Sequence, residues 1–277
     1  MGRPADAAAR FLQAARTFNV SLEHMWASED AAGLGQACLI VPQAGRTGMV
    51  FTSRPVEAAE LDDLARVLAA ACEEIPGVRL AQGLLEPEEA DLARAYEQAG
   101  FLRIGDLHYL RRNWTDIAAD SHAPWPEGVE VRSWRTGDEA ALMRALERSY
   151  EQTLDCPELC GLRELRDVVD SHKSTGRFDP ALWWLVLHRD APAGALLLSP
   201  CPDQGHVELV YLGVAPELRG AGVAGKLLRM GLGALAERKQ RTVTCAVDAR
   251  NDPAMRLYTR HGFERFSERL ALVRGLA

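Results

Sequence analysis

Apolar residues along the chain recur at two spacings, every second residue or every third to fourth residue, which predict strands and helices respectively. In the first 112 residues these spacings predict a helix, three short strands, a helix, a strand, a helix and a final strand. The strands are expected at 20–26, 36–41, 48–52, 78–85 and 101–110, and the helices at 4–17, from Pro55 onward and at 86–99. The second helix is amphipathic, with an apolar face formed by Leu61, Leu64, Leu68 and Cys72.

The second part of the chain repeats this order of elements. Its strands are expected at 129–134, 182–188, 194–199, 207–214 and 241–247, and its helices at 136–151, 161–174, 227–235 and from Pro253 onward. The sequence Ala-Tyr-Glu-Gln-Ala-Gly-Phe at 95–101 also resembles Leu-Tyr-Thr-Arg-His-Gly-Phe at 257–263. These similarities predict an internal duplication, although an unrelated α+β domain at the N-terminus stays open.

The two repeats are separated by a stretch that lacks either spacing. Residues 113–127 contain Pro124, Pro126 and several polar residues, a composition typical of a linker. We therefore predict an α/β (α+β) protein with domains at 1–112 and 128–277.

A glycine-rich turn (residues 219–226, Arg-Gly-Ala-Gly-Val-Ala-Gly-Lys) lies between the strand predicted at 207–214 and the following helix. The N-terminus of a helix binds anions because its first N–H groups have no partner and its dipole favours negative charge. The glycines at 220, 222 and 225 allow a ligand to approach the backbone closely. The glycine turn therefore predicts a phosphate site, unless it merely connects strand to helix.

Two common phosphate motifs fit this turn poorly. The Walker A pattern requires Ser or Thr after the lysine, and Leu227 occupies that position. The dinucleotide pattern GxGxxG is present, and Asp248 at the end of the next predicted strand does not exclude it. A dinucleotide unit usually opens its domain, however, whereas this turn follows a long segment typical of antiparallel strands.

A third pattern fits both the turn and its surroundings. Arg219-x-x-Gly222-x-Ala224 follows Leu-Gly-Val-Ala-Pro-Glu at 212–217 and precedes Asn-Asp-Pro-Ala-Met-Arg-Leu-Tyr at 251–258. In these motifs, their order and their separation, residues 129–275 resemble the GNAT superfamily of acyl-CoA-dependent N-acetyltransferases. The resemblance implies two tandem GNAT-like domains, each a mixed, mostly antiparallel central sheet flanked by helices. The first domain is degenerate, because Ser-Arg-Pro-Val-Glu at 53–57 contains no glycine turn.

The resemblance also implies which residues bind acetyl-CoA, or another acyl-CoA, as the acyl donor. The N–H groups of 222–226 bind the pyrophosphate, Val214 binds the pantetheine arm, and Leu212 lies near the thioester. Asn251 either holds the pantetheine arm or caps the helix that follows. The full set of cofactor-binding residues is Leu212, Val214, Arg219, Gly220, Gly222, Val223, Ala224, Gly225, Lys226 and Asn251.

Two side chains are candidates for proton transfer. Glu208 matches a position where some family members carry a glutamate base, and it could instead face solvent. Tyr258 matches the tyrosine that protonates the departing thiolate, and it could instead pack in the core. The resemblance therefore implies an N-acetyltransferase in which a primary amine attacks the thioester directly. A non-catalytic acyl-CoA-binding or regulatory protein is the alternative.

Composition limits the partners. The 277 residues carry a net charge of -7, which argues against nucleic acid or an anionic membrane as a partner. No apolar run reaches membrane-spanning length, and the first residues lack the apolar region of a signal peptide. The six scattered cysteines favour the cytoplasm, and their spacing predicts no metal site. The acceptor is expected to be a small-molecule or peptide amine, and the oligomeric state stays open.

Overall fold

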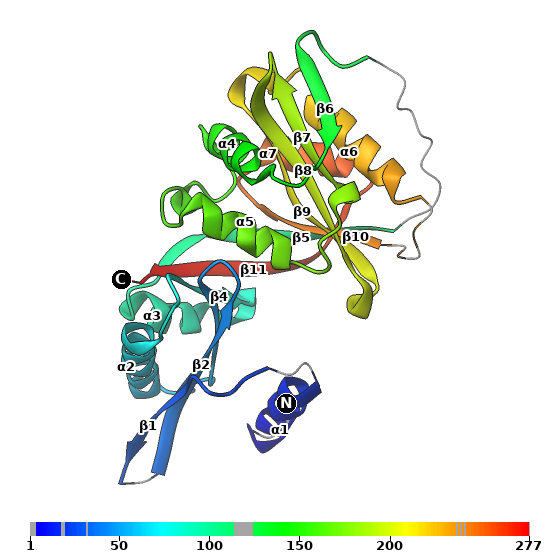
Figure 1. Cartoon of the computed structure of the whole chain (residues 1–277). Helices are drawn as coiled ribbons and strands as arrows, with labels where there is room; N and C mark the ends of the chain where they lie inside the picture. The colour runs from blue at the N-terminus through cyan, green and yellow to red at the C-terminus, as the bar shows by residue number, and fades with distance from the viewer. Residues whose placement is uncertain are drawn as a thin grey trace. The chain divides into compact units, whose positions relative to one another are not determined.

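The computed structural model describes residues 4–17, 20–31, 33–113, 124–236, 238, 240 and 242–276 (Figure 1). The chain forms two compact units, one of residues 1–103 and 271–277 and the other of residues 104–270. The sequence predicted domains at 1–112 and 128–277. The two compact units differ from these bounds, because residues 104–113 belong to the second unit and residues 271–277 to the first. Most of the predicted linker, 114–123, lies outside the described residues.

The first unit is a sheet with helices between its strands. Strands β1, β2, β3 and β4 neighbour one another in that order, followed by the C-terminal part of β11. The pairs β1–β2 and β2–β3 are antiparallel, and β3–β4 is parallel. The elements are α1 (Pro4–Thr17), β1 (Met25–Asp30), β2 (Gly33–Gln43), β3 (Thr47–Thr52), α2 (Ala58–Glu74), β4 (Leu80–Leu85) and α3 (Ala90–Gln98).

The predicted apolar helix face forms the core of this unit. Leu64, Leu68 and Cys72 of α2 are buried, as the helical spacing predicts, whereas Leu61 is half-buried. The first strand lies at 25–30 instead of 20–26, and its last residue, Asp30, pairs with Gly33 at the start of β2.

The second unit contains the glycine turn. Its sheet has the order β11-β5-β10-β9-β8-β7-β6. The pairs β6–β7, β7–β8, β8–β9 and β5–β10 are antiparallel, and β9–β10 is parallel. The elements are β5 (Leu102–Asn113), β6 (Val129–Ser133), α4 (Glu139–Tyr150), α5 (Leu165–Ser174), β7 (Trp183–His188), β8 (Ala191–Cys201), β9 (His206–Val214), α6 (Val223–Ala234), β10 (Thr242–Asp248), α7 (Asp252–Arg260) and β11 (Glu264–Gly275).

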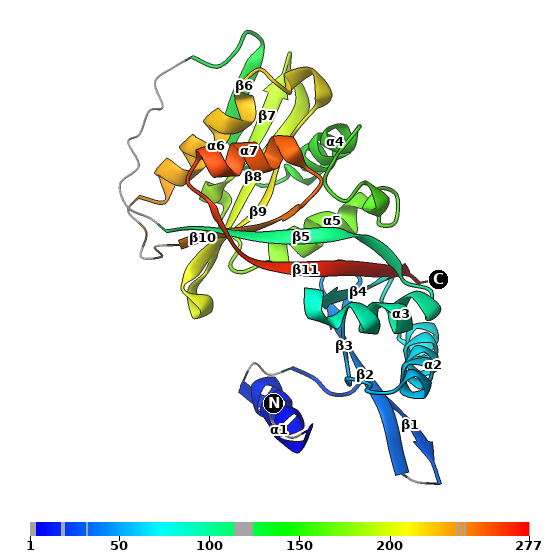
Figure 2. The same ribbon diagram turned by 180° about the vertical axis from the view of Figure 1, so that it is seen from behind.

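Each unit therefore has a mixed, mostly antiparallel sheet flanked by helices, which confirms the predicted fold class. Both units contain two antiparallel pairs followed by one parallel pair, and a helix connects the two parallel strands in each. The position of one strand within the sheet was not predicted from the sequence. Strand β5 precedes the linker in the chain, yet it lies between β10 and β11 in the sheet of the second unit, and Figure 2 shows it alongside β11.

Two apolar cores cover the two faces of the second sheet. Leu227 and Leu228 of α6 pack on one face with Leu209 of β9, and Leu142 of α4 packs on the other with Trp183 of β7. Within the described ranges, no helix is long and apolar enough to cross a membrane. The two cores fix α6 and α4 on opposite faces, so both helices can position residues around β9.

Candidate functional site

Strands β9 and β10 diverge within the second sheet. In the described part of the chain they pair only at Val207–Val243 and Glu208–Thr244. Strand β9 nevertheless continues to Val214, paired with β8, and β10 continues along β5. The facing edges of the two strands beyond Glu208 are therefore not bonded to each other, which leaves backbone groups for a ligand.

A β-bulge in β9 lies beside this divergence. Leu197 of β8 pairs with Tyr211, whereas Leu198 pairs with Leu209, so Val210 is the extra residue. Val210 and Tyr211 consequently both pack in the core beneath α4, while Leu212 packs in the core beneath α6. The bulge thus places Leu212 and Val214 on the strand segment that has left β10.

The glycine turn begins helix α6. Gly220 and Gly222 have φ angles of +77° and +78°, a left-handed conformation that favours glycine, and no atom lies within 4 Å of a Cβ built at either residue. Gly222 is the N-cap of α6, and its carbonyl accepts the N–H of Lys226 at 3.1 Å. The N–H groups just before Lys226 precede the first intrahelical bond and can bind an anion.

The two basic side chains of the turn have different surroundings. The Arg219 guanidinium donates to the carbonyls of Ser149, Glu151 and Gln152 at 3.1, 2.6 and 3.2 Å, at the C-terminus of α4. Its charge therefore acts on the negative end of the α4 dipole. The Lys226 ammonium lies 4.1 Å from the ring centroid of Trp125.

Glu208 occupies the last paired position before the strands diverge. Its carboxylate accepts from the Thr244 hydroxyl, and Nε2 of His206 lies 3.5 Å from it. Burial raises the pKa of the Glu208 carboxyl, and the Thr244 hydrogen bond and His206 partly offset the rise. A carboxylate with a raised pKa is a better proton acceptor, which suits a general base.

Tyr258 of α7 is buried and packs on Phe263, with 5.4 Å between the ring centroids. Burial raises its pKa well above the usual value, and Cys245 of β10, Asp155 and Tyr211 of β9 raise it further. The side chain belongs to the core beneath α6, as one of its two expected roles requires, and its role as an acid stays a prediction.

Asn251 fulfils one of its two expected roles. Its side-chain oxygen accepts the N–H of Ala254 at 3.3 Å and caps α7. The sequence signal for this cap was Pro253 in the first turn.

Comparisons with known proteins agree with this geometry. The model of the acetyltransferase (GNAT) family matches residues 140–263, which include the glycine turn and the 251–258 motif. The mycothiol acetyltransferases of Geodermatophilus obscurus and Saccharopolyspora erythraea are 32% and 30% identical to this chain. The matches cover 72% and 69% of this chain and 65% and 68% of the relatives. The chain belongs to the GNAT acetyltransferase family.

The tandem arrangement also has a structural counterpart. A tandem GNAT protein from the clavulanic acid biosynthesis pathway superposes on this chain with a TM-score of 0.56 and 16% identity, over 93% of this chain and 85% of that protein. At this identity the likeness concerns the fold alone. The chain spans only 44% to 65% of the length of the first curated relatives it matches.

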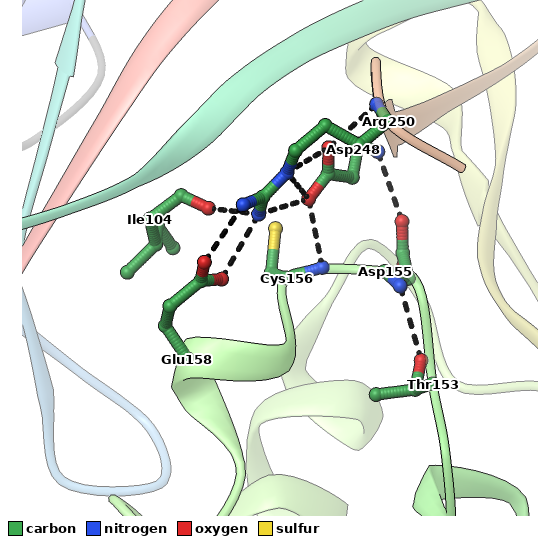
Figure 3. A network of polar contacts seen from close by, with 7 residues as sticks. All are labelled: Ile104, Thr153, Asp155, Cys156, Glu158, Asp248 and Arg250. Carbon is green, nitrogen blue, oxygen red and sulfur yellow. Dashed lines mark hydrogen bonds and ion pairs between the residues drawn. The ribbon is translucent and has the colours of Figure 1, made fainter. Parts of the chain in front are cut away.

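A polar network that the sequence did not indicate lies next to the GNAT motifs (Figure 3). It involves the acceptor loop, defined as residues 151–164 between α4 and α5. Asp248, fully buried at the end of β10, accepts the N–H of Cys156 at 3.0 Å and also binds Arg250. Arg250 in turn pairs with Glu158 at 2.7 Å and donates to the Ile104 carbonyl at 2.6 Å.

Sequence reasoning missed this network because its members have no characteristic spacing. Asp248 was considered only as a possible residue of a dinucleotide site. One local feature of the structure marks the loop. Cys156 has a left-handed backbone with φ +44°, which is uncommon for a residue other than glycine and occurs often near functional sites.

Proposed function

We propose that this GNAT protein is an N-acetyltransferase that transfers an acetyl group from acetyl-CoA to a primary amine. The observation that carries the proposal is the divergence of β9 and β10 immediately before a left-handed glycine turn at the N-terminus of α6. A helix N-terminus suits a pyrophosphate, and an open strand edge suits the amides of a pantetheine arm. The two features follow each other along β9, as one extended ligand requires.

Binding of acetyl-CoA is assigned to backbone groups. The N–H groups of residues 222–226 bind the pyrophosphate, with the Lys226 N–H also bonded inside α6. On the part of β9 that has left β10, Val214 binds the pantetheine arm and Leu212 lies nearer the thioester, with the Val214 carbonyl also accepting from Nε of Arg219 at 3.4 Å. Arg219 supports the site indirectly, since its guanidinium is bonded to carbonyls at the end of α4.

The reaction needs one proton removed and one supplied. The ammonium group gives a proton to Glu208, and the neutral amine attacks the thioester carbonyl carbon. The C–N bond forms, and an N–H of β9 near Leu212 stabilises the negative charge on the carbonyl oxygen. The C–S bond then breaks, the sulfur takes a proton as the product nitrogen loses one, and Glu208 releases its proton to solvent.

Tyr258 is assigned to the departing sulfur. Its raised pKa keeps the hydroxyl protonated at neutral pH, so it is available as a donor. That pKa exceeds the usual pKa of a thiol, so we assign the Tyr258 hydroxyl to a hydrogen bond with the developing thiolate. Transfer of a proton through this hydroxyl to the sulfur is the acid role that the resemblance predicts.

The acceptor class is proposed from the relatives. Several of them are named mycothiol acetyltransferases, which favours a small-molecule amine over a protein side chain. A cytoplasmic location and the absence of a nucleic-acid partner remain predictions from composition.

A thermal-shift titration followed by a free-thiol assay tests the function. Acetyl-CoA at 100 times its Kd should stabilise the protein by about 2.7 kcal/mol, and a panel of primary amines should then release CoA thiol. Gly222→Glu is the matched control, because it places a carboxylate where the pyrophosphate binds. No stabilisation by any CoA ester refutes the proposal, and stabilisation without thiol release from any amine supports the non-catalytic alternative.

A further inference from the structure

Asp155, in the loop between α4 and α5, is bonded to the C-terminal end of β10, where β10 has diverged from β9. Its Oδ1 accepts the backbone N–H of Asp248, the last residue of β10, at 2.9 Å (Figure 3). The Asn251 side chain also hydrogen-bonds the Asp155 carboxyl. Asp155 therefore joins the acceptor loop to both the strand end and the start of α7.

The backbone on both sides of Asp155 is held in place. Its own N–H donates to Oγ1 of Thr153 at 3.1 Å, and the next N–H, from Cys156, donates to the buried Asp248 carboxylate. Arg250 then ties Asp248 to Glu158 further along the same loop. These bonds hold the backbone of the loop on both sides of Asp155.

The carboxylate of Asp155 has no cationic partner. Among the residues that the structure describes, no Lys, Arg or His forms an ion pair with it, whereas Asp248 and Glu158 on the same network both bind Arg250. Its bonded partners are neutral donors, and the residue keeps an exposed surface. A fixed and unpaired carboxylate of this kind can accept hydrogen bonds from a cation that enters from solvent.

The charge of Asp155 also acts on two tyrosines of the second unit. The residue as a whole is exposed, but burial of its carboxyl group raises the pKa of that carboxyl, and the Asp248 N–H and Asn251 partly offset this rise. The negative charge of Asp155 in turn raises the pKa of Tyr258 and of Tyr211. Tyr211 follows the bulge of β9, so Asp155 is within electrostatic reach of both diverging strands.

We propose that Asp155 binds the ammonium group of the acceptor and thereby selects cationic primary amines. This inference rests on the proposed acetyltransferase function and adds the charge of the substrate. Glu208 is less suited to hold the ammonium, because it is already engaged by Thr244 and His206. The two carboxylates thus divide the work, with Asp155 holding the amine and Glu208 accepting its proton.

The test compares Asp155→Asn with Glu151→Gln at pH 7.5. Asparagine retains an oxygen that accepts the Asp248 N–H, so the loop stays held while the charge is lost. Glu151→Gln removes a charge from an exposed side chain of the same loop. Ethylamine is the cationic acceptor, and methoxyamine, of similar size and neutral at this pH, is the uncharged one.

Asp155→Asn should raise the KM for ethylamine by about tenfold or more, the effect of losing a hydrogen bond to a charged group. In Asp155→Asn, the KM for methoxyamine and the Kd for acetyl-CoA should stay within about twofold of the wild type. In Glu151→Gln, both KM values and the Kd for acetyl-CoA should also stay within about twofold, because an exposed charge contributes little. An unchanged KM for ethylamine, or an equal rise for both nucleophiles, overturns the proposal. A weakened affinity for acetyl-CoA also overturns it, because it indicates a structural role.

Calorimetry separates this inference from the proposed function. Ethylammonium is titrated into the complex of the wild type with CoA, and into the same complex of Asp155→Asn, so turnover is not needed. Binding that is lost in the variant supports the role of Asp155 even if no amine releases thiol, and equal or absent binding in the two proteins refutes it.

Discussion

Substitution of Gly222 by alanine tests the geometry of the glycine turn most directly. Gly222 has φ +78°, and no atom lies within 4 Å of the added Cβ, so the substitution introduces no clash. The cost is therefore conformational, about 1–2 kcal/mol for an L-residue held in the left-handed region. Gly222→Ala should lower the free energy of unfolding by this amount.

Gly233 provides a matched control on the same helix. It lies near the end of α6, its φ is not positive, and a Cβ there also meets no atom within 4 Å. Alanine in a helix is more favourable than glycine by about 0.8–1.0 kcal/mol, so Gly233→Ala should raise stability. The same chemical change at two positions of one helix should thus differ by about 2–3 kcal/mol.

Denaturant unfolding followed by tryptophan fluorescence, with and without acetyl-CoA, measures both effects. Any relief of this strain in Gly222→Ala moves the turn away from the left-handed conformation, so the N–H groups that bind pyrophosphate lose alignment. Stabilisation by acetyl-CoA should then fall well below the value for Gly233→Ala. Shifts of the same sign in the two variants, or full acetyl-CoA stabilisation in Gly222→Ala, would refute the assignment of the turn.

Three further predictions concern protons. Because the pKa of Glu208 is raised and a base acts only when ionised, kcat/KM should fall as pH drops through that raised pKa, and Glu208→Gln should abolish this limb of the pH–rate profile. Burial, then Arg163, lowers the pKa of His172 from 6.5 to about 4. Between pH 6.5 and pH 4, His172 gains a proton only in the unfolded state. The contribution of His172 to the free energy of unfolding is therefore full above pH 6.5 and falls by up to about 2 kcal/mol at pH 5. Denaturation of His172→Gln, measured as a function of pH, should lack this loss. Tyr258→Phe should leave the melting temperature nearly unchanged and lower kcat by about 10–100-fold, and an unchanged kcat would contradict its assignment.

The sequence was sufficient for the features that depend on backbone chemistry. Left-handed angles at Gly220 and Gly222 restrict those positions to glycine, so the conformation of the turn leaves a trace in the residue types. The cap at Asn251 leaves a similar trace through its residue type and the proline that follows. Local requirements of this kind can be recognised without knowledge of the tertiary fold.

Features that depend on distant partners could not be predicted. Alternating residues indicated a strand at 101–110, but this spacing does not specify which strands lie beside it. Arg219 is equally uninformative in the sequence, since three of the carbonyls it binds, at the end of α4, lie 67 to 70 residues away. Asp155 likewise has no distinguishing neighbours in the sequence, because its partner Asp248 is 93 residues distant.

The acceptor loop is held from both diverging strands, and this explains how a segment with little regular structure can carry a positioning residue. On one side, Arg219 follows β9 and binds the carbonyls of Glu151 and Gln152, at the start of the loop. On the other side, Asp248 ends β10 and binds the loop at Asp155 and Cys156. The position of Asp155 therefore depends on both strands, and under our proposal an amine bound at Asp155 lies next to the divergence of β9 and β10. A change in the separation of the strands would move the carboxylate, so binding of acetyl-CoA in the divergence and binding of the amine at Asp155 should be energetically coupled.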